Sequence, residues 1–151
     1  MICVDASVAA KWVFAEELQR QAEALYQQTV VTGERIVAPP LLPIEVTNIV
    51  RQRMRRAKQS GEPPLSLAEA RQHLERFLTF SVELGLPPQL HERALELAAA
   101  HGLPAVYDAH YIALAEVLGC ELWTADRNLV NALQGKLPFV RWIGDYLKTQ
   151  E

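Results

Sequence analysis

Four acidic side chains, spread over most of the chain, have neighbours that suit metal-dependent chemistry. They are Asp5, Glu45, Asp108 and Asp126. Brought together without compensation, four carboxylates repel one another, which raises their proton affinity and destabilises the fold. A hard divalent cation, Mg²⁺ or Mn²⁺, removes that cost because it prefers oxygen ligands. One or two such ions would activate water and stabilise charge on a phosphate, so the acids predict phosphodiester hydrolysis.

The acids are expected to meet because each follows a strand or opens a helix. Short apolar runs predict strands at residues 2–4, 35–38, 80–84, 120–124 and 139–142. Apolar spacing and capping residues predict helices at about 7–14, 16–31, 41–58, 66–78, 87–101, 105–118 and 126–133, with a last helical turn within 143–151. Ser66, with Glu69 three residues on, predicts a capping box at the start of the fourth helix. Strands that alternate with helices imply an α/β fold, in which helices sandwich a parallel sheet. Ligands bind at the carboxyl edge of such sheets, where all four acids are expected.

Each acid taken alone has a simpler explanation. Helix N-termini favour negative charge, and an aspartate before a helix is commonly its N-cap. Asp5 directly follows the apolar run Ile2 to Val4, so capping would explain it well enough. The metal-site hypothesis therefore depends on four acids at the same edge.

Composition is that of an ordinary globular domain. The 151 residues are 50% hydrophobic and 22% charged, which predicts a single domain over 1–151. The net charge of −3 gives no overall attraction to nucleic acid. No apolar run is long enough to span a bilayer, and no signal peptide is recognisable, so we expect a cytoplasmic protein. Cys3 and Cys120 are expected in strands as free thiols, with a disulfide as the weaker alternative.

The segments around the acids carry a family resemblance. V-D-A-S-V-A-A-K-W, which contains Asp5, resembles the opening of PIN-domain ribonucleases, specifically the VapC-type toxins of prokaryotic toxin–antitoxin pairs. P-P-L-L-P-I-E-V-T-N, with Glu45, resembles the second motif of that family. Y-D-A-H-Y-I-A-L-A and T-A-D-R-N-L resemble the third and fourth, with Asp108 and Asp126. The four motifs occur in order over nearly the whole chain.

The resemblance implies a fold, an activity and partners. The fold would be a three-layer α/β/α sandwich with a five-stranded parallel sheet of order 3-2-1-4-5. The activity would be Mg²⁺- or Mn²⁺-dependent endoribonuclease, with Asp5, Glu45, Asp108 and Asp126 as catalytic metal ligands. Homodimers are implied, together with a small antitoxin protein that wraps the toxin and approaches the acidic pocket.

Two hydroxyl residues beside the acids are candidates for accessory roles. Ser7 is predicted either to hydrogen-bond a metal-bound water or to be the N-cap of the first helix. Thr124, at the end of its strand, is expected to orient Asp126 or a phosphate. Asn128, about one turn further on, is a weaker candidate, with a surface position as its alternative.

The helix that carries Glu45 also carries residues suited to RNA. Asn48 shares a face with Glu45 by i, i+3 spacing and is expected to help to position RNA at the pocket mouth. The basic residues that follow are Arg51, Arg53, Arg55, Arg56 and Lys58. They predict either a solvated helix face or a ridge that follows RNA phosphates and gives salt-dependent binding. The four histidines show no ligand spacing, and Tyr107, Tyr111 and the tryptophans are expected in the core or an interface.

Two other functions share parts of this pattern. A receiver-like signalling domain also has a parallel sheet and an Mg²⁺-binding acid after its first strand. It normally has an acidic pair there, an acceptor Asp after strand three and a Lys after strand five, none of which this sequence shows. A catalytically inactive PIN-fold binding module is the other alternative, although all four acids are present.

Overall fold

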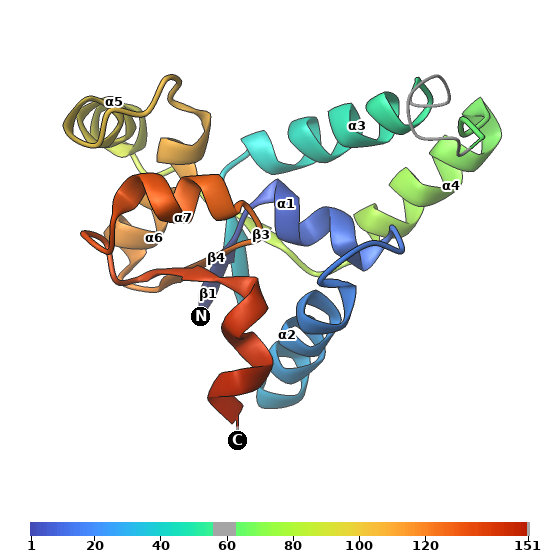
Figure 1. Ribbon diagram of the computed structural model, residues 1–151, viewed down its shortest axis with the longest axis horizontal. Helices are drawn as coiled ribbons and strands as arrows, with labels where there is room; N and C mark the ends of the chain where they lie inside the picture. The colour runs from blue at the N-terminus through green and yellow to red at the C-terminus, as the bar shows by residue number, and fades with distance from the viewer. Residues whose placement is uncertain (56–62, 151) are drawn as a thin grey trace.

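Five short parallel strands form the centre of the molecule (Figure 1). The computed structural model describes residues 1–55 and 63–150. The strands are β1 (Ile2–Val4), β2 (Ile36–Ala38), β3 (Glu83–Leu84), β4 (Glu121–Thr124) and β5 (Val140–Trp142). Their order is β3-β2-β1-β4-β5, and every neighbouring pair is parallel, which confirms the predicted 3-2-1-4-5 sheet. In register, Cys3 of central β1 lies opposite Val37 on one side and Leu122 on the other.

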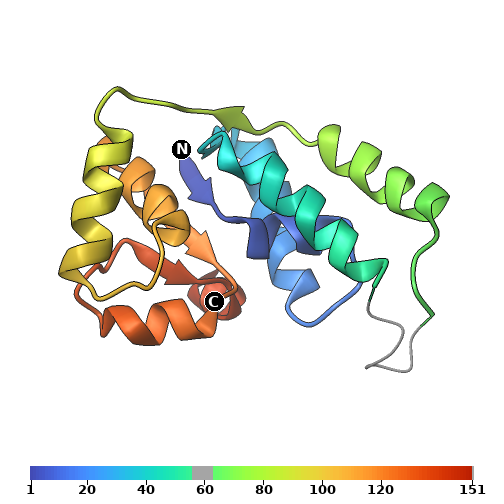
Figure 2. The same cartoon turned by 90° about the horizontal axis from the view of Figure 1, so that it is seen from above.

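Helices cover both faces of the sheet and complete the three predicted layers. They are α1 (Ala6–Ala9), η1 (Ala10–Trp12), α2 (Gln19–Thr32), α3 (Leu41–Arg53), α4 (Leu67–Leu78), α5 (Leu90–Ala100), α6 (Tyr107–Leu118), α7 (Arg127–Leu133) and η3 (Ile143–Gln150). Figure 1 shows α5 and α6 on one side of the strands, with α1 and α2 on the other. Viewed from above, α4 lies beside α3, far from the α5–α6 pair (Figure 2). None of the helices in the described ranges could span a membrane.

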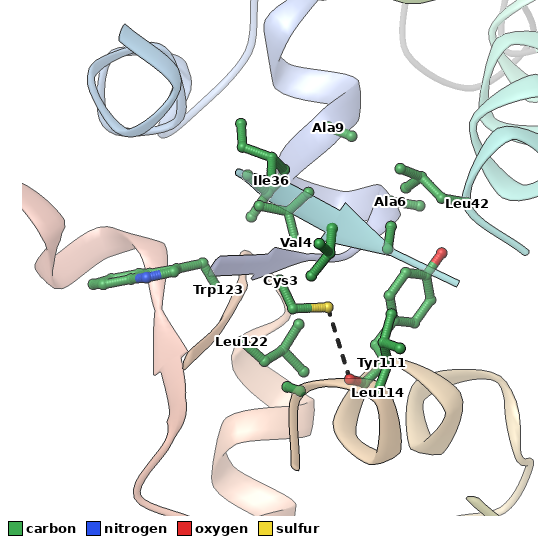
Figure 3. Packing of buried hydrophobic residues seen from close by; sticks show 14 of the residues in the cluster. Cys3, Val4, Ala6, Ala9, Ile36, Leu42, Tyr111, Leu114, Leu122 and Trp123 are labelled. Carbon is green, nitrogen blue, oxygen red and sulfur yellow. Dashed lines mark hydrogen bonds between the residues drawn. The ribbon is translucent and has the colours of Figure 1, made fainter. Parts of the chain in front are cut away.

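The central strand β1 is buried along its whole length. Cys3 and Val4 have no exposed surface, and Leu122 of the adjacent strand is equally buried (Figure 3). Complete burial of a Val or Leu side chain is worth about 1.5–3 kcal/mol relative to exposure. The Cys3 Sγ lies 3.8 Å from the Tyr111 carbonyl oxygen of α6, and both cysteines are free thiols. The strand that ends at Asp5 is therefore held from both faces.

Several element boundaries differ from the sequence-based expectation. The predicted strand 80–84 is reduced to two exposed residues, Glu83 and Leu84, which pair with Val37 and Ala38 at the end of β2. Cys120 precedes β4 and is half-buried, so its placement in a strand was wrong. The helix expected from 16 begins at Gln19, since Leu18 adopts a left-handed φ of 66°.

Local capping explains the start of α4, whereas α3 ends earlier than predicted. The predicted capping box at Ser66 is confirmed: its Oγ accepts from the Glu69 N–H at 3.1 Å, and the Glu69 carboxylate accepts from the Ser66 N–H at 2.7 Å. The helix predicted to reach residue 58 ends at Arg53, and the remainder of that prediction lies largely outside the described residues.

Candidate functional site

A pocket of about 210 Å³ opens at the carboxyl edge of the sheet and collects the four acids. Its lining comes from the end of β1, from α1, α3 and α6, and from the residue before α7. The lining residues are Asp5, Ala6, Ser7, Glu45, Asn48, Ile49, Asp108, Tyr111 and Asp126. The expectation that distant acids meet at one sheet edge is therefore met in the structure.

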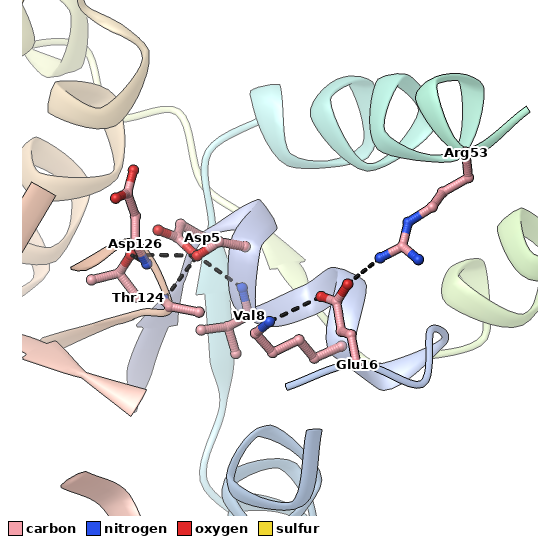
Figure 4. Close-up of polar contacts among 9 residues, drawn as sticks. Asp5, Val8, Glu16, Arg53, Thr124 and Asp126 are labelled. Atoms are coloured by element: carbon pink, nitrogen blue, oxygen red, sulfur yellow. Dashed lines mark hydrogen bonds and ion pairs between the residues drawn. The ribbon is translucent and has the colours of Figure 1, made fainter. Parts of the chain in front are cut away.

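Asp5 is both the N-cap of α1 and a wall of this pocket. Its Oδ1 accepts from the Ser7 hydroxyl at 2.5 Å and from the Val8 N–H at 3.1 Å (Figure 4). Burial raises the pKa of Asp5 to about 6, and the charge of Asp108 adds to the rise. The hydrogen bonds from Ser7, Thr124 and Val8 act in the opposite direction and favour the carboxylate. Asp5 thus carries a charge that its buried site penalises.

Ser7 joins the ends of the two central strands rather than capping a helix. Its Oγ donates to Asp5 and accepts from the Ala125 N–H at 2.8 Å. Thr124, fully buried at the end of β4, lies 3.4 Å from Ser7 Oγ and accepts from the Asp126 N–H at 3.0 Å. The alternative of Ser7 as an N-cap was wrong, because Asp5 occupies that position. Thr124 orients the backbone at Asp126, close to the predicted role, from behind the pocket wall.

Glu45 is held by a residue that the sequence did not single out. The hydroxyl of Tyr111 donates to Glu45 Oε2, which links α6 to α3 across the pocket. Burial raises the pKa of Glu45, the bond from Tyr111 lowers it, and Asp108 raises it. Tyr111 is 1% exposed, as expected for a core residue, yet its hydroxyl reaches the pocket. Its i+3 spacing from Asp108 on one helix face is the signal that would have found it.

The last two acids come from the starts of α6 and α7. Asp108 is in the first turn of α6, half-buried, and its pKa is raised by burial and then by the charge of Asp126. Asp126 is the N-cap of α7, and its Oδ1 accepts from the backbone N–H groups of Asn128 at 2.9 Å and Leu129 at 3.1 Å. The side chain of Asn128 is exposed and does not line the pocket, which matches its alternative as a surface residue.

The basic run divides into residues with different environments. Arg51 and Arg55 are exposed near the end of α3, outside the pocket lining. Arg53 instead turns inward, where it pairs with Glu16 and lies 4.7 Å from the centre of the Phe14 ring. Glu16 also binds Lys11 Nζ at 2.9 Å, so one carboxylate ties α3 to η1 (Figure 4).

Arg53 was therefore wrong as part of an open basic ridge, because its charge is already neutralised by Glu16. Arg56 and Lys58, the other two candidates in this run, lie outside the described residues. The ridge prediction thus rests on Arg51 and Arg55 in the part of the chain that the structure describes.

The donor set of the pocket fits a hard cation by chemistry. All four charged side chains offer oxygen, and burial raises the pKa of three of them, Asp5, Glu45 and Asp108. Such uncompensated negative charge is the environment in which Mg²⁺ or Mn²⁺ is favoured. As the side chains stand, no three Asp, Glu, His or Cys residues within 1–55 and 63–150 are grouped closely enough to hold an ion. The acids share the pocket but are not a preformed cage.

Comparison with known proteins agrees with this geometry. The model of the PIN domain family matches residues 2–132. A relative, VapC ribonuclease Mb0985 of Mycobacterium bovis, is 33% identical over 138 residues, which cover 91% of this chain and 95% of the relative.

Two solved structures have the same fold. The crystal structure of PAE2754 from Pyrobaculum aerophilum covers 98% of this chain and 93% of its own, with a TM-score of 0.64 and 26% identity. Mycobacterium tuberculosis VapC20, a sarcin–ricin loop cleaving toxin, covers 87% of this chain and 95% of its own with a TM-score of 0.58. At 16% identity, that second likeness supports the fold alone. From its matching family model and its relatives, this chain belongs to the PIN-domain family and is related to the VapC ribonucleases.

Proposed function

We propose that this protein is a Mg²⁺- or Mn²⁺-dependent endoribonuclease, the toxin of a type II toxin–antitoxin pair. The observation that carries the proposal is the single pocket lined by Asp5, Glu45, Asp108 and Asp126. The relatives named as ribonucleases support RNA as the substrate. One or two divalent ions held by the four carboxylates would supply a nucleophilic water and neutralise charge on the scissile phosphate.

The chain's own residues would position the reacting groups. Ser7 keeps the Asp5 carboxylate oriented toward the pocket through its 2.5 Å hydrogen bond. Tyr111 holds Glu45 in the same way from α6. Asn48, on the pocket wall, offers a side-chain amide that can donate to an RNA phosphate or base. No covalent protein nucleophile is required for this chemistry.

The test is RNA cleavage by purified protein with a matched pair of substitutions. Asp108→Asn should abolish EDTA-sensitive cleavage, while Asp145→Asn, at an exposed site paired with Lys148, should leave it unchanged. Circular dichroism would establish that both variants are folded. Full cleavage by the Asp108→Asn protein would refute the mechanism.

The alternatives predict different results with the same protein. An inactive PIN-fold module would bind RNA or protein but show neither Mn²⁺ binding by calorimetry nor cleavage. A receiver-like domain would need an acceptor Asp after β3 and a Lys after β5. The chain has Gly85 after β3 and Ile143 after β5, so neither requirement is met.

The partners are part of the proposal. A small antitoxin should co-purify with the protein and block cleavage.

We propose a homodimer through the apolar surface around Ile44, Leu86 and Tyr107, which are 66%, 59% and 59% exposed around an apolar pocket of about 310 Å³. Light scattering should give twice the mass of one chain, and Ile44→Asp should reduce the measured mass to that of a single chain. The cytoplasmic location stays a prediction.

A further inference from the structure

An arginine that directly follows the pocket residue Asp126 lies over a tryptophan ring. The Arg127 Cζ lies 4.1 Å from the centre of the Trp142 ring. Arg127 directly follows Asp126, which lines the pocket. In the sheet register, Trp142 lies opposite Thr124 at the carboxyl end of β5. The guanidinium therefore lies one strand away from the residues that support Asp5 and Asp126.

The tryptophan is fixed in this orientation from its surroundings. A Cβ placed on Gly144 would overlap the six-membered ring of Trp142, so only glycine permits that close approach. The indole N–H of Trp142 is buried and has no acceptor within the described residues. The ring thus keeps its place under Arg127 although its own hydrogen bond is unmet.

Arg127 of α7 has no hydrogen-bond partner among the described residues, unlike Arg141 of the neighbouring strand β5. Arg141 also lies over an indole, 5.4 Å from the Trp123 ring, but it pairs with Glu121 at 3.1 Å. Arg127 is exposed and has no carboxylate partner in residues 1–55 and 63–148. A guanidinium stacked on an aromatic face still presents its in-plane N–H groups, which match a phosphate in a bidentate manner.

A cation beside the acidic pocket would offset the repulsion between the carboxylates and an RNA phosphate. Burial leaves Asp5 and its neighbours with unfavourable negative charge, which repels an incoming phosphodiester. Figures 1 and 2 show α7, which begins at Arg127, and α3 on opposite sides of β1. An RNA strand that reaches from the exposed Arg51 and Arg55 of α3 to Arg127 would cross the pocket.

We propose that Arg127, stacked on Trp142, binds a backbone phosphate of single-stranded RNA on the α7 side of the acidic pocket. This contact rests on the proposed nuclease function, because it assigns one side of the path of that substrate. Stacking restricts the arginine to few rotamers, so less conformational entropy is lost when the phosphate binds.

The test measures the salt dependence of RNA binding by the full-length Asp5→Asn protein, which should bind without cleaving. Fluorescence anisotropy of a labelled single-stranded RNA of mixed sequence is followed from about 50 to 200 mM salt. Adding Arg127→Ala should weaken binding about three- to fivefold at the lowest salt. It should also reduce the slope of log K against log salt by about 0.7, the loss of one phosphate contact on a single strand.

Two further variants separate charge from folding. Arg127→Lys should restore the slope, because the charge remains, but not the full affinity, because the planar stacked fork is lost. Arg141→Ala is the matched control, since its charge is paired with Glu121, and it should leave the slope unchanged. A loss of stability alone would alter the melting temperature and not the slope.

The outcomes separate a failure of the Arg127 contact from a failure of the proposed nuclease function. If the Asp5→Asn parent binds RNA and Arg127→Ala leaves its slope unchanged, the contact is refuted and the nuclease proposal stands. If Arg141→Ala lowers the slope as much as Arg127→Ala does, the assignment to Arg127 is also refuted. If the wild-type protein neither cleaves nor binds RNA, the proposed function fails and the contact fails with it.

Discussion

Replacing Asp5 with Asn should stabilise the metal-free protein at neutral pH while it abolishes cleavage. The pKa of Asp5 rises from 3.8 to about 6 on folding, with burial as the largest cause. A difference of about two units at roughly 1.4 kcal/mol per unit corresponds to about 3 kcal/mol of destabilisation when the carboxylate is charged. Asn keeps an Oδ1 that can accept from Ser7 and Val8, so the cap of α1 should survive.

The sign of the pH dependence follows from the raised pKa. Below about pH 4, Asp5 is protonated in both the folded and the unfolded chain, so its ionisation does not lower the free energy of unfolding. Between about pH 4 and pH 6 the unfolded chain releases the proton first, so folding stability falls as pH rises. Above pH 6 the full penalty applies. The advantage of Asp5→Asn should therefore be absent at pH 4 and complete at pH 7.

Thermal unfolding in EDTA measures this difference. About 3 kcal/mol corresponds to a melting temperature roughly 6–12 °C higher for the variant at pH 7, in a domain of this size. Asp145→Asn, whose carboxylate is exposed and paired with Lys148 at 3.2 Å, should change stability by less than about 1 kcal/mol at either pH. Added Mn²⁺ should stabilise the wild-type protein more than the Asp5→Asn variant, since the cation binds the charged site.

The reasoning would be refuted if Asp5→Asn were less stable than wild type at pH 7 in EDTA. That result would mean that the hydrogen bonds to the carboxylate outweigh its burial. An equal gain at pH 4 and pH 7 would also contradict it, because the gain would then be independent of charge.

Three other substitutions test the supports of the site. Tyr111→Phe removes the hydrogen bond to Glu45, and the loss of a bond of about 1–2 kcal/mol should lower cleavage roughly tenfold at pH 7. The acidic limb of the pH–rate profile should move to higher pH, since the pKa of Glu45 should rise further without that bond. Ser7→Ala leaves the Ala125 N–H without its acceptor and should cost about 1–2 kcal/mol of stability in urea unfolding, with slower cleavage. Glu16→Gln leaves the partly buried Arg53 without its counter-charge and should lower the free energy of unfolding by about 1–3 kcal/mol in the same assay. Cleavage per folded molecule should persist, and a large loss of cleavage would show that this ion pair also shapes the pocket.

Local patterns were sufficient for the elements and poor for their edges. The capping box at Ser66 and the apolar run before Asp5 depend on residues close in sequence, so both were predicted correctly. The start of α2 was misjudged because Leu18 takes a left-handed conformation that no local preference indicates. The length of β3 depends on how far it pairs with β2, which is a property of the sheet and not of the local sequence.

The alternation of strands and helices determined, by itself, that four distant acids would reach one edge of a parallel sheet. That outcome needs only the order of elements and the direction of each strand. Tertiary structure decided which other side chains face those acids. It brought the Tyr111 hydroxyl to Glu45 and withdrew Arg53 to Glu16, because helix rotation and packing depend on contacts between residues far apart in sequence. It also stacked Arg127 on Trp142, a pairing that depends on where β5 ends beside α7.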